Sequence, residues 1–389
     1  MAPTKPKSKG QKGRAKERAT PTVNTREMLA KATAALEAGD PETAIEEARA
    51  AYRHIGEQGR QAGAALTLLG HIYVELGEIE KARKFFLTAV GVDDAGALPE
   101  DLGGGPEKFL WLAQLSEEGG QDSVSWFERG AAALRAQIQT LTDALDSRPL
   151  IRAQQEAVIN EKKRKLADAL CAVAEVYMTD LSWEEDAEQR CEALITEATM
   201  LAPEVAETWQ TVANVRISQL RMDEARAALK RSLGIWSELS PEDPAVPPFP
   251  TRVSLVRLLI EVGMEESAIE VAEQLIGEDD RSVEVWYLGG YGRYTMGEKL
   301  KQAAQLSEEA GWQRIWRSSR KWLAQCLRIF EAEEYEDERL RDHARELLAS
   351  IKAELGDATN AGGDDDVWEE TDDEDDDDES GSDEDEEME

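Results

Sequence analysis

Six small or aromatic residues recur at fixed places in residues 64–89, and their spacing constrains the fold more than any other feature. They are Gly70, Tyr73, Gly77, Ala82, Phe86 and Ala89. This is the spacing of a two-helix repeat of about 34 residues. Gly70 and Ala82 are small enough for two antiparallel helices to touch, and Gly77 lets the chain turn between them. Tyr73 and Phe86 fill the space beside the contact, so the sequence predicts a helical hairpin here.

The pattern recurs along most of the chain. Clean matches span 25–54, 209–232 and 255–272, looser ones span 166–203 and 286–326, and a degenerate one spans 110–134. Residues 337–355 have the one-sided apolar pattern of a helix that caps the last repeat. The repeats resemble the tetratricopeptide family, whose helical pairs stack into a right-handed superhelix with a concave groove. We therefore expect an all-α superhelix of about seven helical pairs with a C-terminal capping helix.

The two ends of the chain differ in composition from the repeats. Residues 1–23 are rich in Lys, Pro, Gly and Thr, and residues 357–389 are mostly acidic. Such segments have too little apolar surface to fold. The sequence thus predicts a disordered basic arm over 1–23, a superhelix over 24–356 and a disordered acidic tail over 357–389. Two interruptions, 97–107 and the proline-rich 240–250, are loops between repeats, because the pattern resumes after each.

Charge restricts the possible partners. The 389-residue chain carries a formal net charge of −36; residues 364–389 contribute −19 and residues 1–20 contribute +6, which leaves −23 on the repeats. Nucleic acids reward Lys and Arg contacts, so this surface argues against direct binding of DNA or RNA and favours a very basic protein. The chain has no apolar run of about 18 residues, so we expect no membrane partner.

The residues that usually carry catalysis or bind metals are few and scattered. His54, His71 and His343 fall in separate predicted helices, and no metalloprotease, nucleophile-elbow or P-loop motif is present. The cysteines, Cys171, Cys191 and Cys326, fit core positions of helices and suit a reducing, intracellular setting. We therefore expect no enzyme activity, no catalytic residue, no metal and no cofactor.

The first helix of each pair lines the groove in tetratricopeptide proteins, so the inward positions can be read from the sequence. Carboxylates and one amide follow the groove at Glu37, Glu75, Asp168, Glu175, Glu207, Asn214, Glu261 and Glu284, and tyrosines follow at Tyr287, Tyr291 and Tyr294. Further negative charge at the C-terminal end comes from Glu265, Glu266, Glu334, Asp337 and Glu338. Carboxylates supply charge-assisted hydrogen bonds and tyrosines a flat face for Arg or Lys, so these residues suit a basic peptide segment. The alternative is that many of them are ordinary solvated charges.

One ligand class is excluded by the same positions. A subset of the family binds the acidic C-terminal tails of heat-shock chaperones through Lys-x-x-x-Asn and Lys-x-x-x-Arg pairs on the groove helices. The first groove helix has Leu29 and Thr33 at these places. The lysine clamp is absent, and the acidic surface would repel an acidic tail.

The order of parts resembles a family of fungal chaperones dedicated to the large-subunit ribosomal protein of the L-four family. The parts are a Lys-rich arm, acidic repeats and the tail VWEETDDEDDDDESGSDEDEEME, and residues 193–233 look particularly similar. The resemblance implies that the groove captures the long basic internal loop of the newly made ribosomal protein. It also implies protection from aggregation and from RNA, and shuttling between cytoplasm and nucleus.

Two features leave alternatives open. The basic clusters between Lys5 and Arg18 are typical of a nuclear-import signal, which would make an import receptor a partner, although a plain solvated segment has the same composition. A nuclear histone chaperone also combines such repeats with acidic stretches. A scaffold subunit of a multiprotein complex is a third reading of the repeats.

Overall fold

The computed structural model describes residues 24–57, 59–145, 152–304 and 311–356. Within these ranges the chain forms fifteen α-helices and one short 3-10 helix, with no strand. The all-α fold predicted from the repeat spacing is confirmed. The predicted basic arm and acidic tail lie outside the described residues, so their disorder stays a prediction.

Fourteen of the helices form seven consecutive antiparallel pairs. The pairs are α1 (Thr25–Glu37) with α2 (Pro41–Ile55), α3 (Ala62–Glu75) with α4 (Ile79–Val92), α5 (Glu107–Gln114) with α6 (Gly120–Leu145), α7 (Arg152–Met178) with α8 (Ala187–Leu201), α9 (Ala206–Ser218) with α10 (Met222–Trp236), α11 (Phe249–Glu261) with α12 (Glu265–Glu278), and α13 (Val283–Ala304) with α14 (Gly311–Ala332). The last helix, α15 (Glu338–Leu355), packs on α14 and α13 as the predicted cap.

Small residues hold the pairs together where the repeat pattern placed them. A Cβ atom on Gly70 would lie 2.6 Å from the ring of Phe86, so only glycine lets α3 and α4 approach this closely. Gly77, in the turn between these two helices, has a φ of +69°, a left-handed conformation that side chains with a Cβ rarely adopt. Around this contact Tyr73, Ala82 and Phe86 form one buried cluster.

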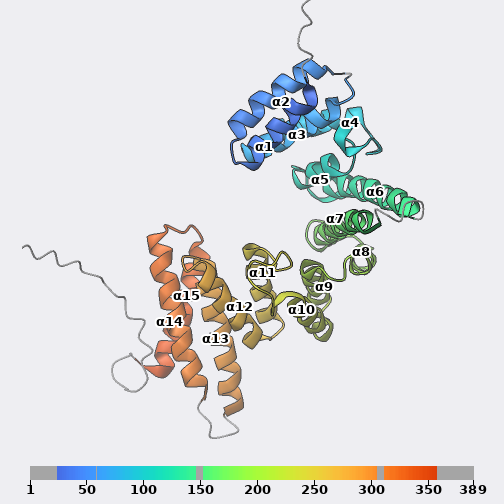
Figure 1. Ribbon diagram of the computed structural model, residues 1–389. Coiled ribbons are helices and arrows are strands. Elements are labelled where there is room, and N and C mark those ends of the chain that lie inside the picture. The colour runs from blue at the N-terminus through green and yellow to red at the C-terminus, as the bar shows by residue number, and fades with distance from the viewer. Residues whose placement is uncertain (1–23, 58, 146–151, 305–310, 357–389) are drawn as a thin grey trace, which may run out of the picture.

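The first helices of the pairs lie on the inner side of the curve. Among the described residues α7 packs on α9, α9 on α11, and α11 on α13, whereas the second helices do not pack on one another in this way. Elements on the inside of a curved stack are closer together, so the odd-numbered helices form the concave surface. Figure 1 shows the chain curving round an open side, with α1–α4 at one end of the arc and α13–α15 at the other.

The two predicted interruptions lie between repeats. Residues 97–107 contain the 3-10 helix η1 (Glu100–Leu102), and this loop is anchored by a buried ion pair between Lys108 Nζ and Asp93 Oδ2 at 2.9 Å. The proline-rich 240–250 segment leads into α11, which starts at Phe249 with Pro250 in its first turn, where a missing N–H costs nothing. The two longest helices are α6 and α7, in the middle of the chain.

Candidate client-binding surface

Four carboxylates on the concave helices have no cationic partner. They are Asp168 and Glu175 on α7, Glu207 on α9 and Glu261 on α11, and in the described part of the chain no Lys, Arg or His nitrogen lies within 4.0 Å of their oxygens. Glu207 is half-buried and the other three are exposed. Helical periodicity predicted all four as inward-facing. The structure brings them onto three successive first helices, α7, α9 and α11.

Asp168 and Glu207 share a cleft of about 450 Å³ between α7 and α9. Burial by the surrounding helices and, to a smaller extent, the nearby charge of Glu207 raise the pKa of Asp168 to about 6, against the opposing effect of Arg164. Asp168 is still open to solvent on one side, so the crowding of the cleft rather than full enclosure causes the shift. A cation that binds beside Asp168 would stabilise its ionised form.

Glu175 lies two helical turns after Asp168 on the same face of α7 and extends the negative charge along it. Burial raises its pKa, while a hydrogen bond from Thr211 of α9 lowers it in part. Asn214, one turn further along α9, is exposed and offers a neutral amide beside these carboxylates. The concave surface of α7 and α9 therefore combines under-compensated negative charge with hydrogen-bonding groups.

Arg164, Glu204, Pro244 and Ala245 complete the cleft and were missed by the sequence reasoning. Arg164 Nε lies 3.2 Å from Glu204 Oε1, so its charge is directed to the rim. Pro244 and Ala245 come from the proline-rich loop, for which helical periodicity gives no position. The prolines predicted a loop at these residues but did not predict that it would pack beside α7 and α9.

Three predicted groove acids have other surroundings in the structure. Glu284 forms an ion pair with Arg257 of α11. Glu265 is only 7% exposed and lies 2.5 Å from Lys299 Nζ, so its charge is already compensated within the chain. Glu266 lines a hollow of about 390 Å³ formed by α12, α13 and α14, on the outer side of the stack. Glu265 and Glu266 were predicted to add negative charge beside the groove. In the structure Glu265 pairs with Lys299, and Glu266 lines the hollow between α12, α13 and α14.

The three predicted tyrosines on α13 face the capping helix. The hydroxyl of Tyr287 lies 2.7 Å from His343 Nδ1, and the hydroxyl of Tyr294 lies 3.0 Å from Ser350 Oγ. Tyr291 packs edge-on against His343 with ring centroids 5.5 Å apart. All three are half-buried. Their contribution to partner binding stays a prediction, but their first role in the structure is to hold α15.

The remaining predicted acids are exposed at helix ends. Glu37 ends α1 and Glu75 ends α3. Asp337 caps α15 by accepting hydrogen bonds from the backbone N–H groups of Arg339 (3.0 Å) and Leu340 (3.2 Å), while Glu334 and Glu338 are solvent-exposed beside it. Asp337 therefore has a structural role that a charge pattern alone does not reveal.

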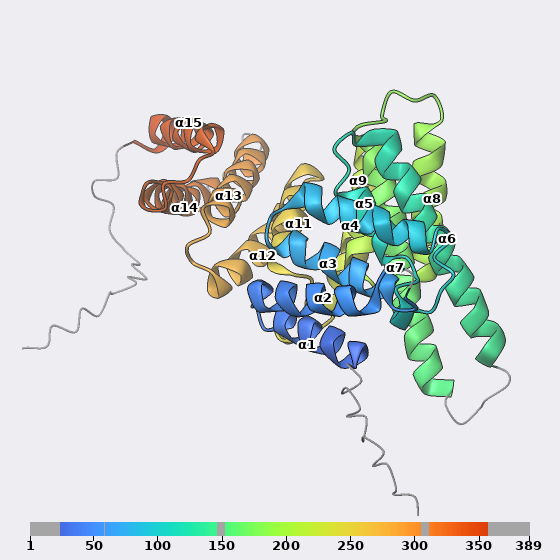
Figure 2. The same ribbon diagram turned by 90° about the horizontal axis from the view of Figure 1, so that it is seen from above.

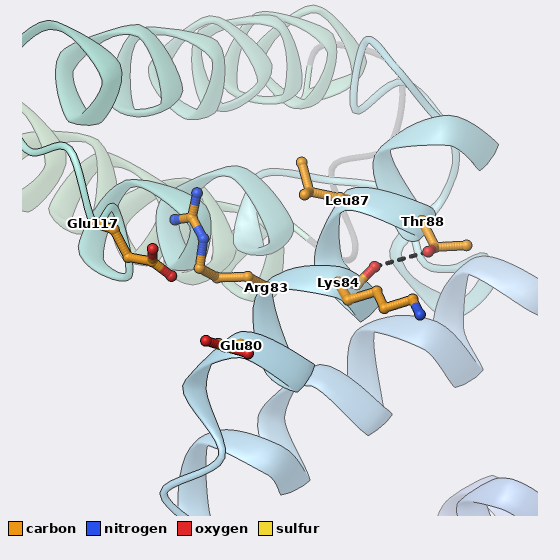
Figure 3. A pocket seen from close by; sticks show the side chains of 6 residues that line it. All are labelled: Glu80, Arg83, Lys84, Leu87, Thr88 and Glu117. Atoms are coloured by element: carbon orange, nitrogen blue, oxygen red, sulfur yellow. Dashed lines mark hydrogen bonds between the residues drawn. The ribbon is translucent and has the colours of Figure 1, made fainter.

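A hollow on the outer face is a joint between repeats rather than a site. Figure 3 shows its lining from α4 and the turn before α6, with Arg83 directed toward Glu117. The Arg83 guanidinium donates hydrogen bonds to the carbonyls of Leu112 and Leu115 at the end of α5. The Thr88 hydroxyl donates to the Lys84 carbonyl at 2.7 Å. The Arg83 bonds tie α4 to the end of α5, which is why we regard the hollow as a joint; Glu80, Lys84 and Glu117 also line it and form no ion pair in the described part of the chain.

The described residues show no arrangement suited to a metal, and none of their helices is long and apolar enough to cross a membrane. All three cysteines are buried and unpaired. Burial raises the pKa of Cys171 and of Cys326 to about 12. These thiols are therefore core side chains with little thiolate at neutral pH.

Comparison with known proteins agrees with the repeat geometry. The tetratricopeptide repeat family matches residues 63–95, the α3–α4 hairpin. A protein of Emericella nidulans named probable assembly chaperone of rpl4 is 45% identical over 339 residues, which cover 85% of this chain and 82% of that protein. The chain belongs to the family of rpl4 assembly chaperones.

Two further members of the rpl4 assembly chaperone family support this assignment. The probable assembly chaperone of rpl4 of Schizosaccharomyces pombe is 33% identical over 290 residues, which cover 74% of this chain and 80% of that protein. A solved structure of the Assembly Chaperone of RpL4 (Acl4), residues 1–338, is 71% identical, with a TM-score of 0.70; the match covers 72% of this chain and all of that one. The family resemblance and the superhelix expected from the sequence are both confirmed.

Proposed function

We propose that this protein is a dedicated chaperone of the newly made ribosomal protein Rpl4 and that it acts by binding rather than by catalysis. Its relatives named assembly chaperone of rpl4 cover most of the chain, which supports this client. A ribosomal protein that must bind RNA is rich in Lys and Arg, and an acidic concave surface is complementary to it.

The client segment is the long basic internal loop of the ribosomal protein. The observation that carries this proposal is the set of unpartnered carboxylates on α7, α9 and α11, because their charges are not neutralised within the described chain. Crowding raises the pKa of Asp168 and of Glu175, and a bound Arg or Lys would relieve that unfavourable state. A loop held here is kept from RNA and from other unfolded chains.

The protein accompanies its client from the cytoplasm to the nucleus. The basic clusters between Lys5 and Arg18 support an import signal read by an import receptor. Fusing residues 1–25 to a fluorescent protein tests this part separately. Nuclear accumulation of the fusion is expected, and an even distribution through the cell would contradict an import signal in the arm.

Co-purification at low ionic strength tests the client itself. We expect the full chain to retain Rpl4, and an Rpl4 variant without its internal loop to bind far more weakly. Recovery of histones instead would favour a histone chaperone, and recovery of a stable multiprotein complex would favour a scaffold subunit. Either of these results without Rpl4 would overturn the proposed function.

A further inference from the structure

Helix α14 is basic, although the repeats as a whole are acidic. Between Gly311 and Phe330 it contains five cations and no carboxylate: Arg314, Arg317, Arg320, Lys321 and Arg328. Four of them, at positions 314, 317, 321 and 328, are exposed and recur at helical spacing on one face. The buried residues Trp316, Leu323 and Phe330 occupy the opposite face. We call these four cations the α14 stripe.

The α14 stripe forms no ion pair in the described part of the chain, although Arg314 lines a hollow with Glu266, Glu270 and Glu273, and Arg328 lines one with Asp280 and Glu333. None of its four cations lies within 4.0 Å of a carboxylate oxygen, and none has a hydrogen bond or ring contact. By contrast, Arg252 pairs with Glu278 and Arg281 with Glu333. The stripe spans about 21 Å, at 1.5 Å per residue. Unpaired like charges one helical turn apart repel one another, so an anionic occupant would stabilise this face.

The end of α15 lies close to the start of the α14 stripe. Helices α14 and α15 lie side by side in both views (Figures 1 and 2). The last turns of α15, at Ile351 and Leu355, belong to the same apolar cluster as Trp312 and Trp316 at the start of α14. The helix ends at Leu355 with Gly356 as its cap. The chain therefore leaves the superhelix at the level of the first turns of α14, where the α14 stripe begins.

The residues that follow are a polyanion of sufficient reach. Residues 364–389 contain 19 carboxylates and no Lys or Arg. The eight residue steps from Gly356 to Asp364 can span about 26 Å when extended, which exceeds the length of the stripe. A tethered segment has an effective concentration of about millimolar, so contacts that are individually weak in water suffice for docking.

We propose that the α14 stripe is the docking surface for the acidic tail of the same chain. The tail then lies on the outer side of the superhelix, away from the carboxylates on α7, α9 and α11. Docking has two consequences. It leaves the concave surface free for a basic client, and it covers a cationic helix face that would otherwise attract RNA. The inference does not depend on which basic protein is the client.

Carbodiimide cross-linking of the full-length chain tests the proposal, because this reagent joins a lysine amine to a nearby carboxylate. Lys321 is the reporter, and we expect it to be joined to carboxylates of residues 364–389. The double substitution R314Q/R317Q keeps Lys321 but removes two stripe cations, and should reduce this cross-link about tenfold. The matched control K230Q/R231Q removes two exposed cations from α10 and should leave it unchanged. Salt at about 1 M, where the screening length is about 3 Å, should abolish it.

Several results would overturn the proposal. Tail carboxylates joined equally to Lys84, Lys230 and Lys321 would mean that the tail has no preferred surface. Tail cross-links formed chiefly with lysines of residues 1–23 would mean that the basic arm is its partner. A mixture of isotopically labelled and unlabelled chains would reveal docking onto a second copy as mixed cross-links. Circular dichroism of R314Q/R317Q checks that the helices are intact; both residues are exposed and neither forms an ion pair in the described part of the chain.

Discussion

The hydroxyl of Tyr287 on α13 lies 2.7 Å from Nδ1 of His343 on α15. This contact joins the last repeat to the helix that caps it. Burial and, to a smaller extent, the neighbouring Tyr291 raise the pKa of Tyr287 to about 12, so Tyr287 is a neutral phenol at physiological pH. A residue placed in the groove by its repeat position is thus part of the packing that ends the superhelix.

Replacing Tyr287 with Phe should destabilise the cap by about 1 kcal/mol, the typical net value of one hydrogen bond. The expected signs are a lower thermal midpoint and faster hydrogen exchange in α15, with little change in client affinity. Exchange measured by mass spectrometry separates α15 from the other helices. A large loss of affinity with unchanged exchange in α15 would instead assign Tyr287 to the binding surface.

Charge reversal distinguishes the concave from the outer face. The variant E207K/E261K should weaken binding of a basic client by about 2 kcal/mol or more, because two close charge contacts become repulsive. The matched control E266K/E270K makes the same change in net charge on the outer face of α12. It should alter affinity much less. Titration of both variants with the client at one salt concentration makes the comparison, and equal losses would argue for a non-specific charge effect.

Proton linkage should identify Asp168 as part of the site. Its pKa of about 6 lies above its ordinary value, so ionised Asp168 lowers the free energy of unfolding. Protonation removes this destabilisation as the pH falls through 6. A bound cation favours the ionised form, so binding near pH 6 should release protons and should weaken as the pH falls from 7 to 5. Calorimetry in two buffers of different ionisation enthalpy measures the release. D168N should remove part of it; an unchanged release would place the linked group elsewhere.

Leu220 should be a strained position. It has a φ of +60° in the turn between α9 and α10 and is 81% exposed. In the equivalent turns of two other pairs the residue is a glycine, Gly77 with a φ of +69° and Gly263 with a φ of +76°. Leu220→Gly should stabilise the protein by about 0.5 to 1 kcal/mol, because relief of left-handed strain exceeds the extra chain entropy of glycine.

The reciprocal substitution Gly77→Leu is the control for Leu220→Gly. A Cβ atom at Gly77 meets nothing within 4 Å, so the conformational strain alone should destabilise the protein, by about 1 kcal/mol. Urea unfolding of both variants gives the two values. A loss of stability in Leu220→Gly would mean that the leucine side chain contributes contacts that outweigh its strain.

Breaking the buried pair of Lys108 and Asp93 should be costly. The Lys108 ammonium also donates to the carbonyls of Gly103 (3.4 Å) and Gly105 (3.3 Å), and Asp93 accepts from the N–H of Ala97 at 3.0 Å. Asp93→Asn should cost about 3 to 5 kcal/mol by leaving a buried charge uncompensated. The double variant D93N/K108M should recover part of this loss in thermal unfolding. A double variant as unstable as the single one would show that loop hydrogen bonds, rather than charge pairing, dominate.

The positions of the groove carboxylates were predictable because helical periodicity fixes the face on which a residue lies. Glu175, Glu207 and Glu261 occur at repeat positions that face inward, and the first helices of successive pairs pack side by side. The spacing of small residues such as Gly70 determined the pairing itself, since only there can two helix backbones approach closely. These are local properties, and the sequence contains them directly.

Only the tertiary structure decided which of those faces is covered and which charge finds a partner. Tyr287 faces inward in its repeat, but α15 returns along the chain to cover it. Glu265 begins a helix like any other acid, but the packing of α13 on α12 places Lys299 against it. The cations of α14 were visible in the sequence. Whether a described carboxylate comes within ion-pair distance of the α14 stripe depends on how α13 and α15 pack on α14, and none does. Periodicity sets direction within one helix, whereas burial and charge compensation depend on contacts between residues far apart in sequence.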